Sequence, residues 1–147
     1  MTCQHPVFVY GTLRPGQGNY RRLLEGRTAN ERPAIAKGLA LFGSGIPYAV
    51  KHPGARVVGT LITITPTLYG EVLADLDTLE GYHAHRPASS HYIRITRAVI
   101  ATNPLPGGGG TWETYHTAWI YLAGGEVDPT TMTRVPHDDW LARVSTR

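Results

Sequence analysis

The chain has 147 residues, the size of one ordinary domain, and we expect a single domain over residues 1–147. Apolar residues make up 41% and charged residues 17%, which excludes intrinsic disorder. A single cysteine excludes an internal disulfide and a multi-cysteine zinc site, and the net charge of +3 comes from scattered arginines, so we expect no nucleic acid partner.

The first third of the chain predicts strands around a glycine-rich loop. Residues 6–10 form a short apolar run that indicates a buried strand, and residues 11–18 carry three glycines and a proline. Asn19 is a plausible N-cap of a short helix that ends at Leu24. Further strands are expected at residues 34–42, 46–50 and 56–64, where Gly59 indicates a bulge or a close backbone approach.

The next segment predicts the main helix. Thr65 and Pro66 are typical of an N-cap and a first helical position. An apolar stripe follows at spacings of four, four and three, which predicts an amphipathic helix of about 15 residues. Gly81 suits the position just past its C-terminus. The stripe consists of Leu68, Val72, Leu76 and Leu79.

The last third predicts a hairpin and a polar tail. Strands at 91–102 and 115–123 flank a loop with four glycines, and a short amphipathic piece is expected at 139–144. Strands that are adjacent in sequence with few helical crossovers favour an antiparallel or mixed sheet. The fold class is therefore α+β, a small mixed, barrel-like β-sheet with one main helix and two minor helices.

The glycine-rich loop is the first candidate site. Gly11 and Gly16 invite comparison with a phosphate-binding loop, but Gln17 and Gly18 stand where Lys and Ser or Thr are needed. What remains is a loop at a strand end whose backbone N–H groups form an anion-receiving nest, or simply a tight turn.

Glu80 is the second candidate. At 100° per residue it falls on the flank of the apolar stripe, whereas Glu71 and Asp77 point well away and Asp75 flanks the other side. Partial burial and the helix C-terminus both raise a carboxyl pKa, which suits a proton shuttle near neutral pH. The alternative is an exposed acid at a frayed helix end.

Other chemistry-bearing residues are weaker candidates. His83 and His85 lack an evident third metal ligand, Ser44 lacks the first glycine of a nucleophile elbow, and Cys3 has no activating neighbour in sequence. Trp112, Trp119 and Tyr121 are most simply core or cleft wall. We therefore expect no metal and no cofactor.

Targeting signals are not evident. The first residues lack a basic region, the apolar run at 7–10 is too short for a signal peptide, and no stretch approaches the ~20 apolar residues that span a membrane. We expect a soluble, cytoplasmic protein with no membrane partner.

Taken in order, these segments resemble the gamma-glutamylcyclotransferase-like family, which includes gamma-glutamylamine cyclotransferase and the butirosin-pathway gamma-glutamyl cyclotransferase. The segments that carry the resemblance are residues 7–19, Gly59-Thr-Leu, residues 76–82, Tyr92-x-Arg94 and Trp119-x-Tyr121. The resemblance implies a small mixed barrel with flanking helices. It also implies that Tyr10, Gly11, Thr12 and Leu13 bind the substrate and that Glu80 is the general acid/base.

In the implied reaction the α-amine of a γ-glutamyl group attacks its own γ-carbonyl and releases an amine and 5-oxoproline. The nucleophile belongs to the substrate, so no catalytic Ser or Cys is needed, and intramolecular attack benefits from proximity. The expected partner is a small γ-glutamyl compound. A second hypothesis keeps the fold but has a decayed site that serves as a small-molecule-binding or interaction module.

Overall fold

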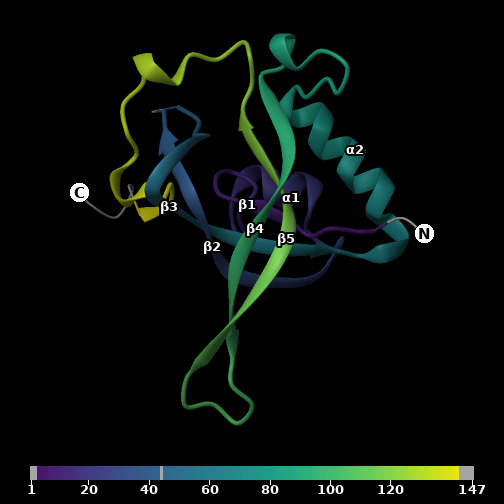
Figure 1. Ribbon diagram of the computed structural model, residues 1–147. Helices are drawn as coiled ribbons and strands as arrows, with labels where there is room; N and C mark the ends of the chain where they lie inside the picture. Colours follow the sequence, from purple (N-terminus) through teal and green to yellow (C-terminus); the bar gives the residue numbers. More distant parts are fainter. Residues whose placement is uncertain (1–2, 44, 143–147) are drawn as a thin grey trace.

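A computed structural model describes residues 3–43 and 45–142, in which five strands close into a barrel (Figure 1). The order around the barrel is β1-β3-β2-β4-β5, with additional contacts of β5 to β3 and β1. Most neighbours are antiparallel, but β5 runs parallel to β1 and β3, so the mixed, barrel-like sheet predicted from the sequence is confirmed. The strands are β1 (Val7–Val9), β2 (Thr28–Phe42), β3 (Tyr48–Ile64), β4 (Tyr92–Pro104) and β5 (Thr111–Ala123).

Strand β1 is buried on both of its faces. Phe8 packs with residues of all five strands in the barrel interior, whereas Val7 and Val9 pack in a second cluster that includes both helices. This follows from the two-residue period of a strand, which sends successive side chains to opposite faces. A strand covered on both sides needs a continuous apolar run, and that run made β1 recognisable.

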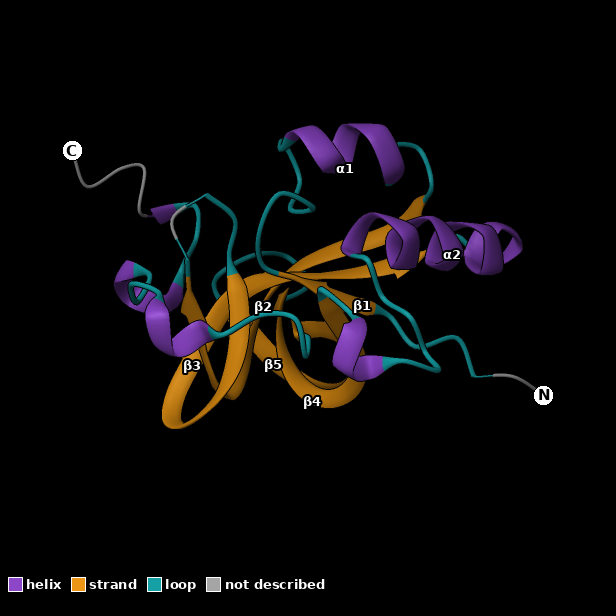
Figure 2. Ribbon diagram, turned by 90° about the horizontal axis from the view of Figure 1, so that it is seen from above, coloured by secondary structure: helices purple, strands orange, loops and turns teal. Residues whose placement is uncertain are grey.

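Two α-helices lie on the same side of the barrel (Figure 2). They are α1 (Gly18–Leu23) and α2 (Tyr69–Glu80). A 3₁₀ turn at Pro66–Leu68 precedes α2, so the predicted helix is present, although its first turn is 3₁₀ and Thr65 makes no side-chain cap. Gly81 ends α2 with φ 64°, as predicted.

The N-terminus of α1 differs from the prediction. The N-cap is Gln17 rather than Asn19, and Asn19 lies inside the helix. The Asn19 side chain instead donates a hydrogen bond to Thr12 Oγ1 at 2.7 Å. A helix this short gains more from docking onto the preceding loop than from a local cap.

The predicted bounds of three strands were also wrong. β5 begins at Thr111 rather than at residue 115. β3 is one strand where two were expected, because it continues through an irregularity between Lys51, which pairs with Leu39, and Arg56, which pairs with Lys37. The residues 51–54 at this irregularity are exposed and so carry no apolar pattern. β2 begins at Thr28 because its polar first half pairs with the end of β3. In contrast, Gly59 marks a close approach, as predicted: a Cβ there would lie 2.4 Å from the Val9 carbonyl oxygen.

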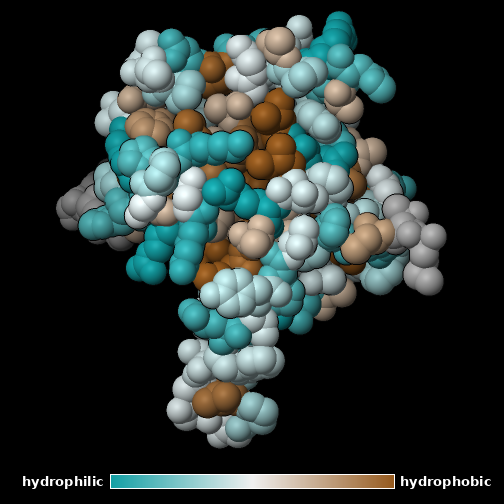
Figure 3. Space-filling view, in the orientation of Figure 1, coloured by the Kyte–Doolittle hydropathy of each residue, from teal (hydrophilic) through white to brown (hydrophobic). Residues whose placement is uncertain are grey.

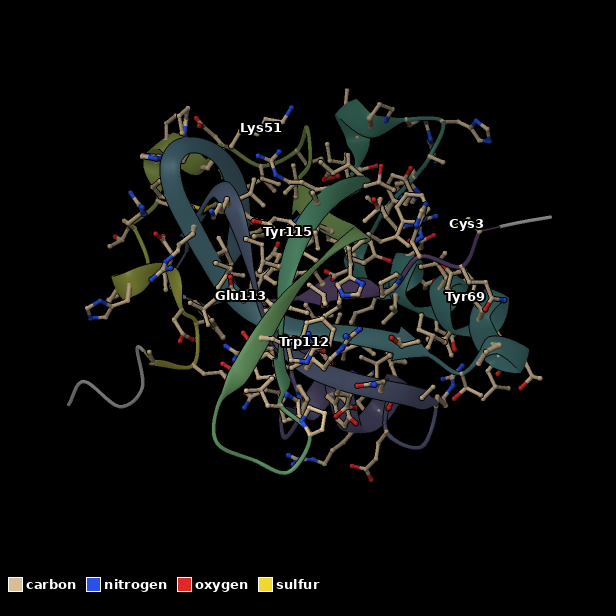
Figure 4. The ribbon with its side chains drawn as sticks, turned by 60° about the horizontal axis from the view of Figure 1, so that its bottom comes forward. Cys3, Lys51, Tyr69, Trp112, Glu113 and Tyr115 are labelled. Carbon is tan, nitrogen blue, oxygen red and sulfur yellow. The ribbon has the colours of Figure 1, made fainter. Side chains whose placement is uncertain are left out.

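The β4–β5 hairpin is present and extends beyond the body of the molecule (Figure 3). Two aromatic side chains of β5 at this end, Trp112 and Tyr115, are exposed (Figure 4). The described residues also contain four 3₁₀ turns, at Pro66–Leu68, Pro87–Ser89, Pro129–Thr131 and Pro136–Asp138. The expected amphipathic piece at 139–144 forms no α-helix over 139–142, and its remainder lies outside the described residues. No helix in the described part of the chain is long and apolar enough to cross a membrane.

Candidate functional site

A cavity of about 270 Å³ lies between the loop that follows β1 and the C-terminal end of α2. Both candidate segments from the sequence line it: Tyr10 to Leu13 on one side and Glu80 on the other. The remaining wall is largely apolar and aromatic, and it includes Asn19, Ile46, Pro47, Leu79, His91, Tyr92 and Tyr121. The structure therefore brings together two segments that are far apart in the sequence.

The loop is held by hydrogen bonds that leave its N–H groups free. The Arg14 N–H donates to the Gly11 carbonyl at 3.0 Å, and the Tyr20 N–H of α1 donates to the Thr12 carbonyl at 3.1 Å. Within residues 3–43 and 45–142, no acceptor is recorded for the N–H groups of Gly11, Thr12 and Leu13. Such a row of unpaired backbone donors suits an anion or a developing oxyanion.

Gly11 cannot be replaced without cost, because a Cβ there would lie 2.7 Å from Pro47 Cγ across the cavity wall. Leu13 anchors the loop through its side chain, which is buried in the cluster that Val7 and Val9 form with the two helices. These two residues shape the loop through packing, so what they offer a ligand is backbone.

Tyr10 has a structural hydroxyl. It donates to the Tyr121 carbonyl at 2.5 Å and accepts from the Ala49 N–H at 3.2 Å, which ties the end of β1 to β5 and β3. Burial, with a smaller contribution from the charge of Glu80, raises the Tyr10 pKa well above its usual value. Tyr10 thus lines the cavity while its hydroxyl is already engaged.

Glu80 is the last residue of α2 and is partly buried. No donor to its carboxylate is recorded among the residues that the structure describes. Burial and, secondarily, the negative charge of Asp77 raise the Glu80 pKa from 4.5 to about 7. A carboxyl with this pKa can both accept and donate a proton near neutral pH.

The aromatic wall was only partly foreseen. Tyr121, assigned to core or cleft wall from the sequence, does line the cavity, whereas His91 and Pro47 were missed. The Tyr92 hydroxyl donates to the Pro47 carbonyl at 2.7 Å, and Tyr48 Oη lies 2.6 Å from His91 Nε2. Since these contacts join β3 to β4, no local sequence pattern could have revealed them.

Asp77 does not point away from the barrel, so that expectation was wrong. Its carboxylate accepts two hydrogen bonds from Arg94, at 2.8 and 3.1 Å, and one from the Tyr121 hydroxyl at 2.6 Å. The predicted stripe was too narrow, because Tyr69 and Leu73 also pack in the apolar cluster under α2. Packing of Leu73 shifts the inward face of α2 toward Asp77.

The weaker candidates lie away from the cavity. His83 and His85 are exposed, and the described residues contain no group of three or more His, Cys, Asp or Glu arranged to hold a metal ion. Cys3 is exposed, with its Sγ 3.7 Å from His5 Nδ1. Ser44 lies outside the described residues.

The fold is a small mixed barrel whose cavity is lined by Glu80 on one side and by the loop from Tyr10 to Leu13 on the other. A family model described as "Gamma-glutamyl cyclotransferase, AIG2-like" matches residues 7–142. The chain belongs to this family, as the resemblance in the sequence indicated.

A characterised relative is gamma-L-glutamyl-butirosin B gamma-glutamyl cyclotransferase from Niallia circulans, 28% identical over 116 residues. The match covers 79% of this chain but 65% of the relative, so the chain spans slightly less than two thirds of that protein.

Solved structures share the fold. An AIG2-like protein from Mus musculus aligns with a TM-score of 0.63 at 20% identity, covering 92% of this chain and 87% of the other. An uncharacterized protein from Pyrococcus horikoshii aligns with a TM-score of 0.61 at 18% identity, covering 96% and 94%. At these identities the likeness shows the fold alone.

Proposed function

We propose that this protein is a γ-glutamyl cyclotransferase in which Glu80 is the general acid/base and the loop from Tyr10 to Leu13 binds the glutamyl group. The observation that carries the proposal is the placement of a carboxyl with a pKa of about 7 in the same cavity as the N–H groups of Gly11, Thr12 and Leu13, with no hydrogen-bond partner for either among the described residues. The family membership and the activity named for the Niallia circulans relative support the same reaction.

The proposed reaction uses only atoms of the substrate. The Glu80 carboxylate takes a proton from the α-ammonium of the γ-glutamyl group, and the α-nitrogen then forms a bond to the γ-carbonyl carbon. The amide bond to the leaving amine breaks as Glu80 returns the proton to that nitrogen. The α-nitrogen loses a second proton when it becomes the lactam N–H, and this proton leaves with the product amine, which is released as an ammonium ion. The products are 5-oxoproline and a free amine, and the stoichiometry requires no co-reactant.

The loop is assigned two tasks. Its N–H groups bind the substrate anion, either the α-carboxylate or the oxyanion that develops on the γ-carbonyl. The cavity fixes the folded conformer of the glutamyl chain and so places the α-nitrogen against the carbonyl carbon. This proximity raises the rate of ring closure. The apolar wall excludes water from a reaction in which water would compete as a nucleophile.

The test is incubation with a panel of γ-glutamyl amines and peptides, with 5-oxoproline measured by chromatography. We expect at least one member to yield 5-oxoproline with the wild-type protein and none to do so with Glu80→Gln. Glu71→Gln is the matched control, because it makes the same change on the same helix at a side chain that is 70% exposed. Substrate binding without any 5-oxoproline would instead support the hypothesis of a binding module with a decayed site.

A further inference from the structure

Asp77 sits one helical turn before Glu80 and is held from two directions. Arg94 of β4 forms a bidentate ion pair with it, and both side chains are mostly buried, at 15% and 23% exposure. The Arg94 guanidinium is itself fixed over the Trp119 ring, 4.1 Å from its centroid, and beside Tyr82 at 5.4 Å. A negative charge is therefore built into the last turn of α2 at considerable cost in desolvation.

The second contact of Asp77 acts on the cavity wall. Tyr121 lines the cavity that contains Glu80, yet its hydroxyl donates to Asp77 Oδ1 at 2.6 Å. As long as Asp77 accepts this hydrogen bond, the hydroxyl is not available to the carboxylate of Glu80.

The other tyrosine hydroxyls around Glu80 also have hydrogen-bond partners. The hydroxyl of Tyr10 donates to a backbone carbonyl of β5, that of Tyr92 donates to the Pro47 carbonyl, and that of Tyr48 is hydrogen-bonded to His91. Among the described residues, the charged and titratable groups around Glu80 are thus Asp77 on its own helix, Tyr10 after β1, Tyr48 on β3, His91 and Tyr92 at β4, and Tyr121 on β5. Arg94 of β4 is the ion-pair partner of Asp77.

We propose that Asp77 is a positioning residue that keeps the Glu80 carboxyl free of protein donors and opposes a second negative charge in the last turn of α2. It does so through its own negative charge, held in place by Arg94, and by engaging the Tyr121 hydroxyl. Side chains one turn apart on a helix are neighbours, at about 5–6 Å between Cβ atoms, so a charge on one disfavours the same charge on the other. The catalytic meaning of this role rests on the proposed function, but the proton affinity of Glu80 does not.

The test therefore measures the proton directly. Protein labelled with ¹³C at the Glu side-chain carboxyl is titrated by NMR, and the Glu80 signal is assigned by its loss in Glu80→Gln. We expect a midpoint near 7 for the wild type. In Asp77→Asn we expect a lower midpoint, with about a tenfold loss of proton affinity, the effect of one neighbouring unit charge.

A matched control separates this effect from general damage to the helix. Asp75→Asn makes the same change on α2 and also breaks an ion pair, Arg27–Asp75 at 3.0 Å, on a side chain that is 45% exposed. We expect Asp75→Asn to leave the Glu80 midpoint unchanged. A midpoint that falls equally in both variants would overturn the proposal.

Asp77→Asn leaves the Arg94 charge without a partner and so can destabilise the fold. The double variant Asp77→Asn/Arg94→Gln removes both charges and keeps amide groups that can hydrogen-bond. It leaves no unpaired charge, so the Glu80 titration can be measured in a folded protein. We expect the lower Glu80 midpoint in this variant as well. An unchanged or higher midpoint in the folded double variant refutes the role of Asp77.

Enzyme activity then separates the two proposals. If a γ-glutamyl compound is turned over, the acidic limb of kcat/KM against pH moves to lower pH in Asp77→Asn, a change that a purely structural role would not produce. If Glu80 titrates as expected but no compound yields 5-oxoproline, the proposed function fails and the assignment of Asp77 stands.

Discussion

Replacement of Glu80 by Gln separates catalysis from stability, because the two are expected to change in opposite directions. Gln keeps the size and hydrogen-bonding capacity of the side chain but cannot carry a proton from the α-ammonium to the leaving amine. General acid–base catalysis contributes typically 10²–10⁴-fold, so we expect a loss of turnover of at least about 10²-fold. Binding of the glutamyl group is expected to persist, because the loop rather than Glu80 is assigned to hold its carboxylate.

Stability is expected to rise, and only at high pH. In the unfolded chain Glu80 ionises near 4.5, whereas in the fold its pKa is about 7. Between these pH values the folded state holds more protons than the unfolded state, so the wild type loses stability as pH rises from about 4.5 through 7. The full loss is at most about 3 kcal/mol. Glu80→Gln lacks this penalty and is therefore expected to be more stable at pH 8 and equal at pH 4.

Urea unfolding at pH 4 and pH 8, combined with the 5-oxoproline assay, measures both effects on one preparation. Glu71→Gln serves again as control. It removes an exposed carboxyl that pairs with Arg27 at 3.2 Å, so it should lower stability by no more than about 1 kcal/mol and leave turnover unchanged. Near-normal turnover by Glu80→Gln would show that Glu80 is not the proton carrier. Destabilisation at pH 8 would show that its carboxylate is structurally satisfied, contrary to the absence of a recorded donor among the described residues.

Three further outcomes are expected from the same structure. Gly59→Ala should lower the free energy of unfolding by at least about 1–3 kcal/mol, because the new Cβ would meet the Val9 carbonyl at 2.4 Å; urea unfolding of a variant as stable as the wild type would contradict this. Tyr10→Phe removes the hydroxyl that donates to Tyr121 and should cost about 1–3 kcal/mol in the same measurement, with the β1 resonances most affected. Acetate or sulfate, titrated into ¹⁵N-labelled protein, should shift the amide signals of Gly11–Leu13 first; shifts confined to another region would count against an anion-binding loop.

Features set by local pattern were predictable from the sequence. β1 is a continuous apolar run because both its faces are buried, and α2 combines an apolar period with Gly81 at its end. Glu80 could be singled out for the same reason, since its flank position and its place at the helix terminus both follow from counting residues. That it shares a cavity with the loop was an expectation from resemblance, and the structure places both at one cavity.

Features set by partners across the barrel could not be predicted in this way. The exposed middle of β3 carries no apolar alternation, and the strand is identified there only because the residues on both sides of it pair with β2. Asp77 shows the same limit within a helix that was otherwise well predicted. Its role depends on Arg94 and Tyr121, which approach from β4 and β5. On a helical wheel, the apolar stripe alone places Asp77 on the side that faces away from the barrel.

The surroundings of Glu80 in the last turn of α2 combine features that the sequence predicts with one that only the fold supplies. Burial, the negative end of the helix dipole and the charge of Asp77 all oppose ionisation of Glu80, and the first two are readable from the sequence. The contribution of Asp77 depends on its ion pair with Arg94, because an unpaired second carboxylate in this partly buried turn would be unfavourable. Gly81 then ends the helix, so that Glu80 faces the cavity instead of another turn of helix. A carboxyl that exchanges a proton near neutral pH suits the proposed reaction, in which a proton moves from the α-nitrogen of the substrate to the nitrogen of its leaving group.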